Sequence, residues 1–322
     1  LESQAAVIRR YADPRQWVTT NYTNVSTTTD PWRTRGLNFS TFTLYPVQGS
    51  NILGGDSYSL GKPANLMEAA AYYGGERGVF GIMELQPGQV NWGDINPQPA
   101  AGAIRLWLWH AFASGASFVS TYRYRHPLMG SEMYHEGIVG TDGVSLSRTG
   151  REFVDTMHEI RALASTLDVL SAPPADWQAR STALLWSHDN YWDLENSRQT
   201  TLWDTWAVRN GYTLSIRATG APLTFIDEGA DFSRYPFLIA PAYQMVTPQL
   251  VSRWRQYVEQ GGHLILTART GQKDAAGHLH EGPWSAPIVA LMGADVDGFD
   301  MIPASTAATV SDGHQTYAWH RW

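Results

Sequence analysis

Short apolar runs alternate with longer segments of helical spacing over the first half of the chain. The short runs are rich in β-branched and aromatic residues, as buried strands are, and cover residues 17–21, 37–45, 79–84 and 118–124. Apolar positions recur at helical spacing in residues 5–11, 64–73, 101–114 and 153–167. Gly74-Gly75 and Gly115 are expected to end the second and third of these helices. Because strands and helices alternate, the pattern predicts an α/β fold with a parallel sheet.

The segment Ser171-Ala172-Pro173-Pro174-Ala175 has the composition of a linker and predicts a boundary between two domains. Beyond it the alternation resumes, with strands expected at residues 182–186, 223–227, 237–240 and 263–267 and helices at residues 201–210 and 248–260. Thr247 is expected to cap the later helix and Gly211 to end the earlier one. This order predicts a flavodoxin-like, doubly wound α/β domain. The expected division is residues 1–170, residues 176–301 and a further segment of residues 302–322, which departs from the alternation.

Composition narrows the possible functions. The net charge is −7 and Lys and Arg are scattered, so the sequence predicts no nucleic-acid partner. No apolar run approaches the ~20 residues that a membrane span needs. The chain contains no Cys, which excludes disulfides and thiolate metal sites and leaves both a cytoplasmic protein and an exported one open; we expect a cytoplasmic location. The 14 Trp and 15 Tyr residues favour a carbohydrate site, although large barrels also use Trp as core filler.

Glu84 is the most informative polar residue in the first half of the chain. It ends the apolar run 79–83 and is followed closely by Pro87-Gly88, which places it at the carboxyl end of a buried strand. A carboxylate at such a position is often only a solvated strand end. In a (β/α)8 barrel, however, catalytic groups are carried at this end of the strands.

Four segments carry a resemblance to a known family. The segments MELQPGQVNW (83–92), NPQPAAGAIRLWLWHAFASGA (96–116), FVSTYRYRHPLMGSEMYHEGIVGTDG (118–143) and GREF (150–153) closely resemble, in this order, the β-galactosidases of glycoside hydrolase family 42. The resemblance continues to about residue 300 and implies strands five to eight of a TIM barrel followed by the trimerisation domain of that family. Barrel strands one to four are then expected upstream of residue 1.

The resemblance also implies roles for five residues. Glu84 matches the catalytic nucleophile on strand seven, and Trp92 matches the Trp that lines the galactose subsite. Glu132 and His135, in the loop after strand eight, match a pair that binds galactose hydroxyls, and Tyr45 ends strand six, where enzymes of this clan hold a Tyr hydroxyl against the nucleophile. The acid/base Glu of the family follows an Asn at the end of strand four and is expected outside this sequence. The pair Glu195-Asn196 has the reverse order and does not replace it.

Several residues have simpler interpretations from the sequence alone. Trp92 and Tyr45 are also consistent with aromatic residues packed against their neighbours, and His135 with an ordinary core or surface histidine. One Glu and one His without further ligands are a weak signal for a metal. Spacing places Arg123 and Arg125 on one side of the last strand and leaves open whether that side faces the barrel interior. We interpret His188, Asp189 and Asn190 as turn and capping residues.

Together these features lead us to expect part of a retaining β-galactosidase that acts on terminal β-D-galactose, needs no cofactor or metal and assembles as a homotrimer. An α-L-arabinopyranosidase of the same family is an alternative that the sequence does not distinguish. A non-catalytic carbohydrate-binding or assembly protein with the same fold is a third. Alone, half a barrel would expose two sheet edges, so we expect these residues to aggregate or to depend on the rest of the barrel.

Overall fold

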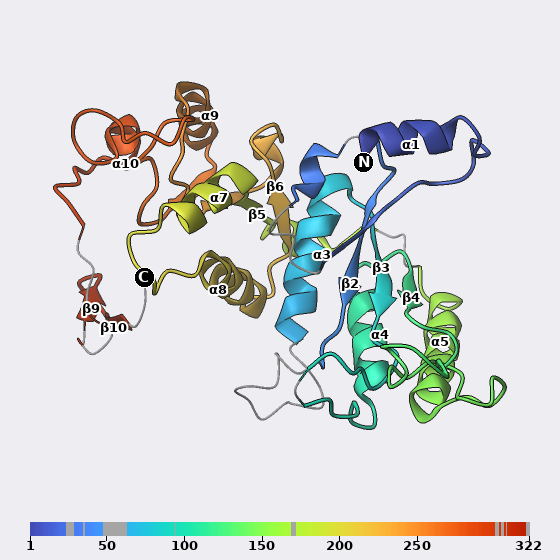
Figure 1. The fold of residues 1–322 in the computed structure, drawn as a ribbon. Coiled ribbons are helices and arrows are strands. Elements are labelled where there is room, and N and C mark those ends of the chain that lie inside the picture. Colours follow the sequence, from blue (N-terminus) through green and yellow to red (C-terminus); the bar gives the residue numbers. More distant parts are fainter. Residues whose placement is uncertain are drawn as a thin grey trace. The chain divides into compact units, whose positions relative to one another are not determined.

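The computed structural model of the protein describes residues 1–23, 29–34, 36–47, 63–93, 95–168, 172–299, 303, 306 and 308–319 (Figure 1). The chain divides into two compact units, Leu1–Gln178 and Ala179–Trp322. The expected domain limits at residues 170, 301 and 302 lie outside the described residues. No helix in the described ranges is long and apolar enough to cross a membrane.

The first unit is built on a parallel sheet whose strands follow their order in the chain. The strands are β1 (Asn21–Thr23), β2 (Ser40–Leu44), β3 (Phe80–Leu85) and β4 (Val119–Thr121). The helices are α1 (Glu2–Arg9), α3 (Pro63–Arg77), α4 (Ala103–Ala113), α5 (Arg148–Ala164) and the short α6 (Ala175–Gln178). Every strand pair is parallel, which confirms the predicted α/β class and brings the carboxyl ends of the strands to one edge of the sheet.

Two predicted boundaries in this unit are wrong. The first strand is Asn21–Thr23 rather than residues 17–21, because Val18 instead bonds to the side chain and backbone of Asn38 ahead of β2. Helix α3 does not end at Gly74-Gly75 but continues to Arg77. Gly78 follows with φ of +74°, an angle that a residue without Cβ adopts at little cost and that commonly ends a helix.

Aromatic rings fill the space between α3 and the sheet. Tyr73 of α3 stacks on Phe42 of β2, with ring centroids 4.9 Å apart, and Phe42 in turn stacks on Phe80 of β3 at 5.9 Å. Tyr22 of β1 also stacks on Tyr73, with ring centroids 6.0 Å apart. Since side chains alternate along a strand, the neighbours of these rings, including Thr43, point to the opposite face of the sheet.

A shift in strand register places Glu84 on that opposite face. Phe42 of β2 pairs with Ile82 of β3, but the next residue of β2, Thr43, pairs with Glu84. Met83 is therefore an extra residue in β3, as in a β-bulge. The shift sets Glu84 directly beside Thr43 at the carboxyl edge of the sheet.

The second unit contains a parallel sheet with the strand order β6-β5-β7-β8 and a separate antiparallel hairpin. The strands are β5 (Thr182–Leu185), β6 (Leu223–Ile226), β7 (Phe237–Ala240), β8 (His263–Leu266) and, in the hairpin, β9 (Ala308–Ser311) and β10 (Thr316–Trp319). The helices are α7 (His188–Asn196), α8 (Thr205–Ala218), α9 (Pro248–Glu259) and α10 (Val289–Met292). The predicted strands and the cap of α9 by Thr247, whose hydroxyl accepts from the Leu250 amide, are present.

The predicted helix at residues 201–210 is wrong in both limits. Helix α8 begins after Asp204, whose carboxylate accepts from the Ala207 amide at 3.0 Å, and it continues to Ala218 with Gly211 inside it. The Cβ that Gly211 lacks would meet nothing within 4 Å, so this glycine neither ends the helix nor makes a close contact. Gly220, with φ of +73°, lies just beyond the true end.

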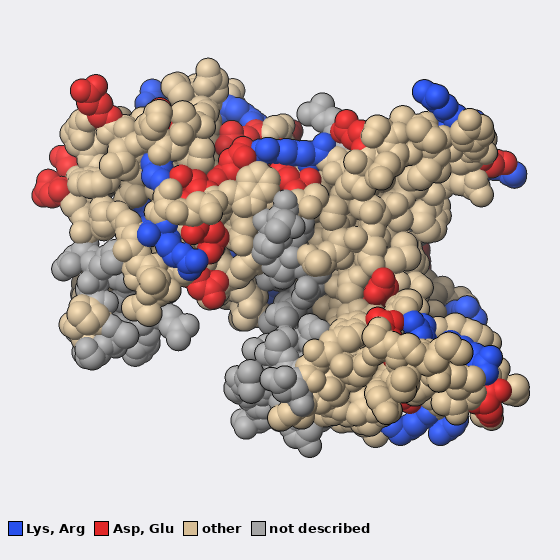
Figure 2. Space-filling model, in the orientation of Figure 1, with Lys and Arg blue, Asp and Glu red and all other residues tan. Residues whose placement is uncertain are grey.

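His188, Asp189 and Asn190 begin helix α7 rather than a simple turn, and Ser187 caps it. His188 accepts a hydrogen bond from Trp186 Nε1 at 3.2 Å, and the Asn190 side-chain oxygen accepts from the Met245 amide at 2.7 Å. The contact of Asn190 ties α7 to the loop after β7. On the face shown in Figure 2, Lys and Arg lie scattered among Asp and Glu.

Candidate active site

Glu84 lies at the carboxyl end of β3 with each carboxylate oxygen bound to a side chain from a different strand. Its Oε1 accepts a hydrogen bond from Asn21 Nδ2 of β1 at 2.9 Å, and its Oε2 accepts one from the Tyr45 hydroxyl at 3.0 Å. The Asn21 side-chain oxygen accepts in turn from the Thr43 hydroxyl of β2 at 3.0 Å. The first three strands of the sheet thus converge on one carboxylate.

Tyr45 immediately follows β2, and its ring is buried. Burial raises the pKa of the Tyr45 hydroxyl well above its usual value, and the Glu84 carboxylate raises it further. Tyr45 therefore keeps its proton and acts as a hydrogen-bond donor to Glu84. The Tyr45 hydroxyl thus helps to hold the Glu84 carboxylate in one orientation.

Gln86 fixes the loops that follow β2 and β3. Its side chain is completely buried, its Oε1 accepts from the Val47 amide at 2.8 Å, and its Nε2 donates to the Val47 carbonyl at 2.7 Å. The same Nε2 donates to the Gly88 carbonyl at 2.8 Å. These bonds fix the chain just after Tyr45 and just after Glu84.

Trp92 lies in the loop after β3 and is 45% exposed. Its ring contacts the edge of Tyr45, with centroids 4.6 Å apart, and of His135 at 5.0 Å. Asn91 Nδ2 donates to the Ser131 carbonyl at 2.6 Å, which ties this loop to the loop after β4. Trp92 thus presents an aromatic surface beside Glu84.

His135 is completely buried, and neither ring nitrogen has a hydrogen-bond partner among the described residues. Burial lowers the pKa of His135 below its usual value, and the Glu132 carboxylate opposes this change. The ring packs edge-to-face on Tyr45, Trp92 and Tyr122. A neutral imidazole carries one donor and one acceptor, so His135 has unused capacity for a ligand hydroxyl.

Glu132 accepts two hydrogen bonds on one oxygen. Tyr122 donates its hydroxyl at 3.0 Å, and Arg123 donates from its guanidinium at 2.7 Å. The Arg123 and Glu132 side chains are 23% and 33% exposed, so this ion pair is partly shielded from water. The other Glu132 oxygen remains available to a ligand.

All five residues predicted from the sequence lie within one connected group. Tyr45 contacts Glu84, Trp92 and His135, and Tyr122 joins His135 to Glu132. Among the described residues, no group of three or more His, Asp and Glu could hold a metal ion. The arrangement combines two carboxylates, a neutral His and an aromatic surface, as a site for a hydroxyl-rich ligand would.

Sequence reasoning missed Asn21 and Tyr122 and left the arginines undecided. Arg123 pairs with Glu132, whereas Arg125 is exposed and donates to the Thr141 carbonyl. The alternation of side chains along a strand could not place the two arginines, because β4 ends at Thr121, before either of them. No local sequence pattern indicated Asn21 as a site residue, because Asn21 and Glu84 lie 63 residues apart in the chain.

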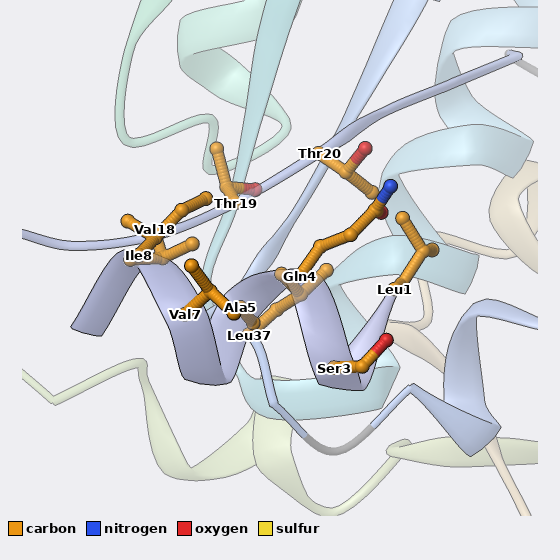
Figure 3. Close-up of a pocket in the computed structure, with 10 residues that line it drawn as sticks. All are labelled: Leu1, Ser3, Gln4, Ala5, Val7, Ile8, Val18, Thr19, Thr20 and Leu37. Atoms are coloured by element: carbon orange, nitrogen blue, oxygen red, sulfur yellow. The ribbon is translucent and has the colours of Figure 1, made fainter. Parts of the chain in front are cut away.

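A separate pocket lies between α1 and residues 18–20 (Figure 3). Its lining is mainly apolar and includes no acidic or basic side chain. None of the five predicted site residues lines it. The candidate site at the carboxyl edge of the sheet is thus separate from this pocket.

The surroundings of His135 allow a test by substitution. In the Glu132→Gln variant we expect the pKa of His135 to fall further, because a negative charge that favours the protonated ring is removed. Histidine titration by NMR in the protein, with His135→Gln to assign the signal, measures this shift. Glu159→Gln on the exposed side of α5 serves as the control and should leave the titration unchanged. An unchanged or higher pKa in Glu132→Gln would contradict the geometry described.

Known proteins resemble both units. Residues 1–163 match the family model described as β-galactosidase of glycoside hydrolase family 42, and residues 180–322 match the β-galactosidase trimerisation domain of the same family. The β-galactosidase BgaH of Haloferax lucentense is 35% identical over 243 residues, which are 76% of this chain and 35% of that protein.

Solved structures agree with this result. The β-galactosidase of Halorubrum lacusprofundi superposes with a TM-score of 0.86 at 31% identity, over 95% of this chain and 45% of that one. The β-galactosidase of Marinomonas ef1 superposes with a TM-score of 0.89 at 27% identity, over 100% of this chain and 50% of that one. The chain thus spans a third to a half of the length of these relatives. It belongs to the β-galactosidase family, glycoside hydrolase family 42, as the sequence resemblance predicted.

Proposed function

We propose that the protein is a retaining β-galactosidase that hydrolyses terminal β-D-galactosides, with Glu84 as the nucleophile. The observation that carries this proposal is the Glu84 carboxylate, held through both oxygens by Asn21 and Tyr45 at the carboxyl edge of a parallel sheet. A fixed, ionised carboxylate at this position suits attack on an anomeric carbon. Membership of a β-galactosidase family supports the choice of substrate.

The reaction requires a second carboxyl group roughly 5 Å from the first. In the first step a Glu84 oxygen bonds to the anomeric carbon, the bond to the leaving oxygen breaks, and the second carboxyl gives that oxygen its proton. In the second step water attacks the same carbon, the bond to Glu84 breaks, and the second carboxyl takes a proton from the water. No metal or cofactor is needed for either step.

We infer that this second carboxyl group is supplied from outside residues 1–322. Glu132 is already bound to Arg123 and Tyr122, which suits a ligand-binding carboxylate better than a proton donor. Glu195 accepts from the Thr205 hydroxyl at 2.6 Å within the second unit, where it joins α7 to α8. The relatives are two to three times as long as the matched region, which is consistent with a carboxyl group supplied by other residues.

The other site residues suit recognition of a galactose ring. Trp92 offers an aromatic face to the C–H face of a sugar, which its exposed fraction of 45% allows. The unpartnered nitrogens of His135 and the second oxygen of Glu132 can bond to sugar hydroxyls, each of which both donates and accepts. Unpaired polar groups in a closed site are costly, so these bonds would favour a ligand with hydroxyls at matching positions.

The Glu84→Ala variant tests the proposal in the full-length protein that contains this chain. We expect hydrolysis of p-nitrophenyl β-D-galactopyranoside to fall by at least about 10⁴-fold, because no covalent intermediate can form. Added azide should restore part of the activity and give α-galactosyl azide. Azide would attack the anomeric carbon from the face that the Glu84 carboxylate would otherwise use. Steady-state kinetics and NMR of the product measure both effects.

The matched control is Asp155→Ala, which removes an exposed carboxylate on α5 and should leave the rate unchanged. Parallel assays with p-nitrophenyl α-L-arabinopyranoside separate the two substrate classes. Retention of galactosidase activity in Glu84→Ala would contradict its role as nucleophile. An inactive wild-type protein that still binds galactose would favour a non-catalytic carbohydrate-binding function.

We also propose that the second unit is a flavodoxin-like domain that joins three copies of the protein. Its parallel strand order, β6-β5-β7-β8, places the first strand between the second and third, as in flavodoxin-like sheets. The match of residues 180–322 to a trimerisation domain supports its role in assembly. Exposed apolar side chains of this unit, Leu202, Ile265 and Leu279, are available for such contacts.

Sedimentation equilibrium of the full-length protein tests the assembly. We expect a mass of three times that of one chain across the micromolar range, because an obligate interface is large and apolar. Cross-linking followed by mass analysis provides an independent count. A single-chain mass at these concentrations would contradict a trimer.

A further inference from the structure

We propose that Asn21 is a positioning residue for Glu84 and that Thr43 orients Asn21; this inference rests on the function proposed above. Asn21 Nδ2 donates to Glu84 Oε1 at 2.9 Å, and the Thr43 hydroxyl donates to Asn21 Oδ1 at 3.0 Å. The three side chains come from β1, β2 and β3, which are adjacent parallel strands. The chain of hydrogen bonds runs across the sheet to the nucleophile.

The chemistry of the three groups fixes the orientation of the Asn21 amide. An ionised carboxylate only accepts hydrogen bonds, so the amide NH₂ must face Glu84. The amide oxygen then faces Thr43, whose hydroxyl is able to donate. The reversed amide would place an oxygen against the Glu84 carboxylate and would be repelled. The Glu84 carboxylate therefore selects the orientation in which Asn21 donates, and the Thr43 hydroxyl holds the amide oxygen in that orientation.

The register shift in β3 makes this contact possible. Without the register shift, Thr43 would pair with Met83, and Glu84 would lie one position further along. With the shift, Thr43 and Glu84 are direct partners across the strand pair. Asn21 pairs with Thr41 on the other side of β2, so its side chain reaches past Thr43 to the carboxylate.

Two donors, one on each oxygen, hold the plane of the Glu84 carboxylate. With Asn21 removed, the Tyr45 hydroxyl alone would hold the group, and the carboxylate could turn about its terminal bond. The attacking oxygen would then be misplaced in part of the population, which lowers the rate of the bond-forming step. Asn21 has no recorded contact with Trp92, Glu132 or His135, so substrate binding should change little.

Kinetics of the full-length protein test this arrangement. We expect Asn21→Ala to lower kcat about 10- to 100-fold, the range for a lost hydrogen bond to a charged group, and to change KM by less than about 2-fold. Thr43→Val, which keeps the shape of the side chain but not the hydroxyl, should lower kcat about 3- to 10-fold. Thr43→Ser keeps the hydroxyl and should retain wild-type kcat.

A double variant shows whether Thr43 and Asn21 affect kcat through the same hydrogen bonds or independently. Because Thr43 acts through Asn21, Thr43→Val should cause no further loss in the Asn21→Ala background. Thermal unfolding midpoints are measured alongside, so that a loss of kcat is separated from a loss of stability. Losses of kcat that multiply in the double variant would overturn the inference, as would equal kcat for Thr43→Val and Thr43→Ser.

Glu84→Ala in the same assay distinguishes this inference from the proposed function. If Glu84→Ala is inactive while Asn21→Ala keeps wild-type kcat, Glu84 is the nucleophile and the positioning role of Asn21 is wrong. If Glu84→Ala stays active, the proposed function itself fails, whatever Asn21→Ala does. Loss of kcat in both variants with KM unchanged in Asn21→Ala supports the inference.

Discussion

The site depends on the parallel pairing of β1, β2 and β3, with one extra residue in β3. Parallel strands place Asn21, Tyr45 and Glu84 at the same edge, and the shift at Met83 turns Glu84 to the face where Asn21 and Thr43 lie. The aromatic packing of Phe42, Tyr73 and Phe80 on the other face keeps that register, because a slip by one residue would exchange the two faces. The pairing of β1, β2 and β3 thus determines both the aromatic packing on one face of the sheet and the geometry of the site on the other.

The loops after β3 and β4 complete the site and are joined to each other by hydrogen bonds. Glu136 accepts from the Gln89 amide at 3.1 Å and donates its own amide to the Gln89 carbonyl at 2.8 Å, which joins the two loops. These ties bring Trp92 and His135 against Tyr45. The result is a rigid aromatic cluster in which the nitrogens of a buried His remain available to a ligand. Rigid placement of this kind is what recognition of a specific sugar requires.

Local features of the sequence predicted most of the elements and drew attention to Glu84, which ends an apolar run shortly before Pro87-Gly88. The roles of Glu84, Tyr45, Trp92, Glu132 and His135 came from resemblance to a family. The end of α3 was misjudged because Gly74-Gly75 fits inside a helix, while only Gly78 has the positive φ that ends one. Asn21 could not be predicted, because its role depends on a strand register that no local pattern encodes.

Covalent labelling tests the central claim most directly. The full-length protein is treated with 2-deoxy-2-fluoro-β-D-galactosyl fluoride, which forms a glycosyl-enzyme that hydrolyses slowly, and its peptides are then mapped by mass spectrometry. The structure predicts one added fluorogalactosyl group per chain, on the peptide that contains Glu84, and its loss when galactoside turnover resumes. A label on another carboxylate, or active turnover without any label, would contradict the assignment of Glu84 as the nucleophile.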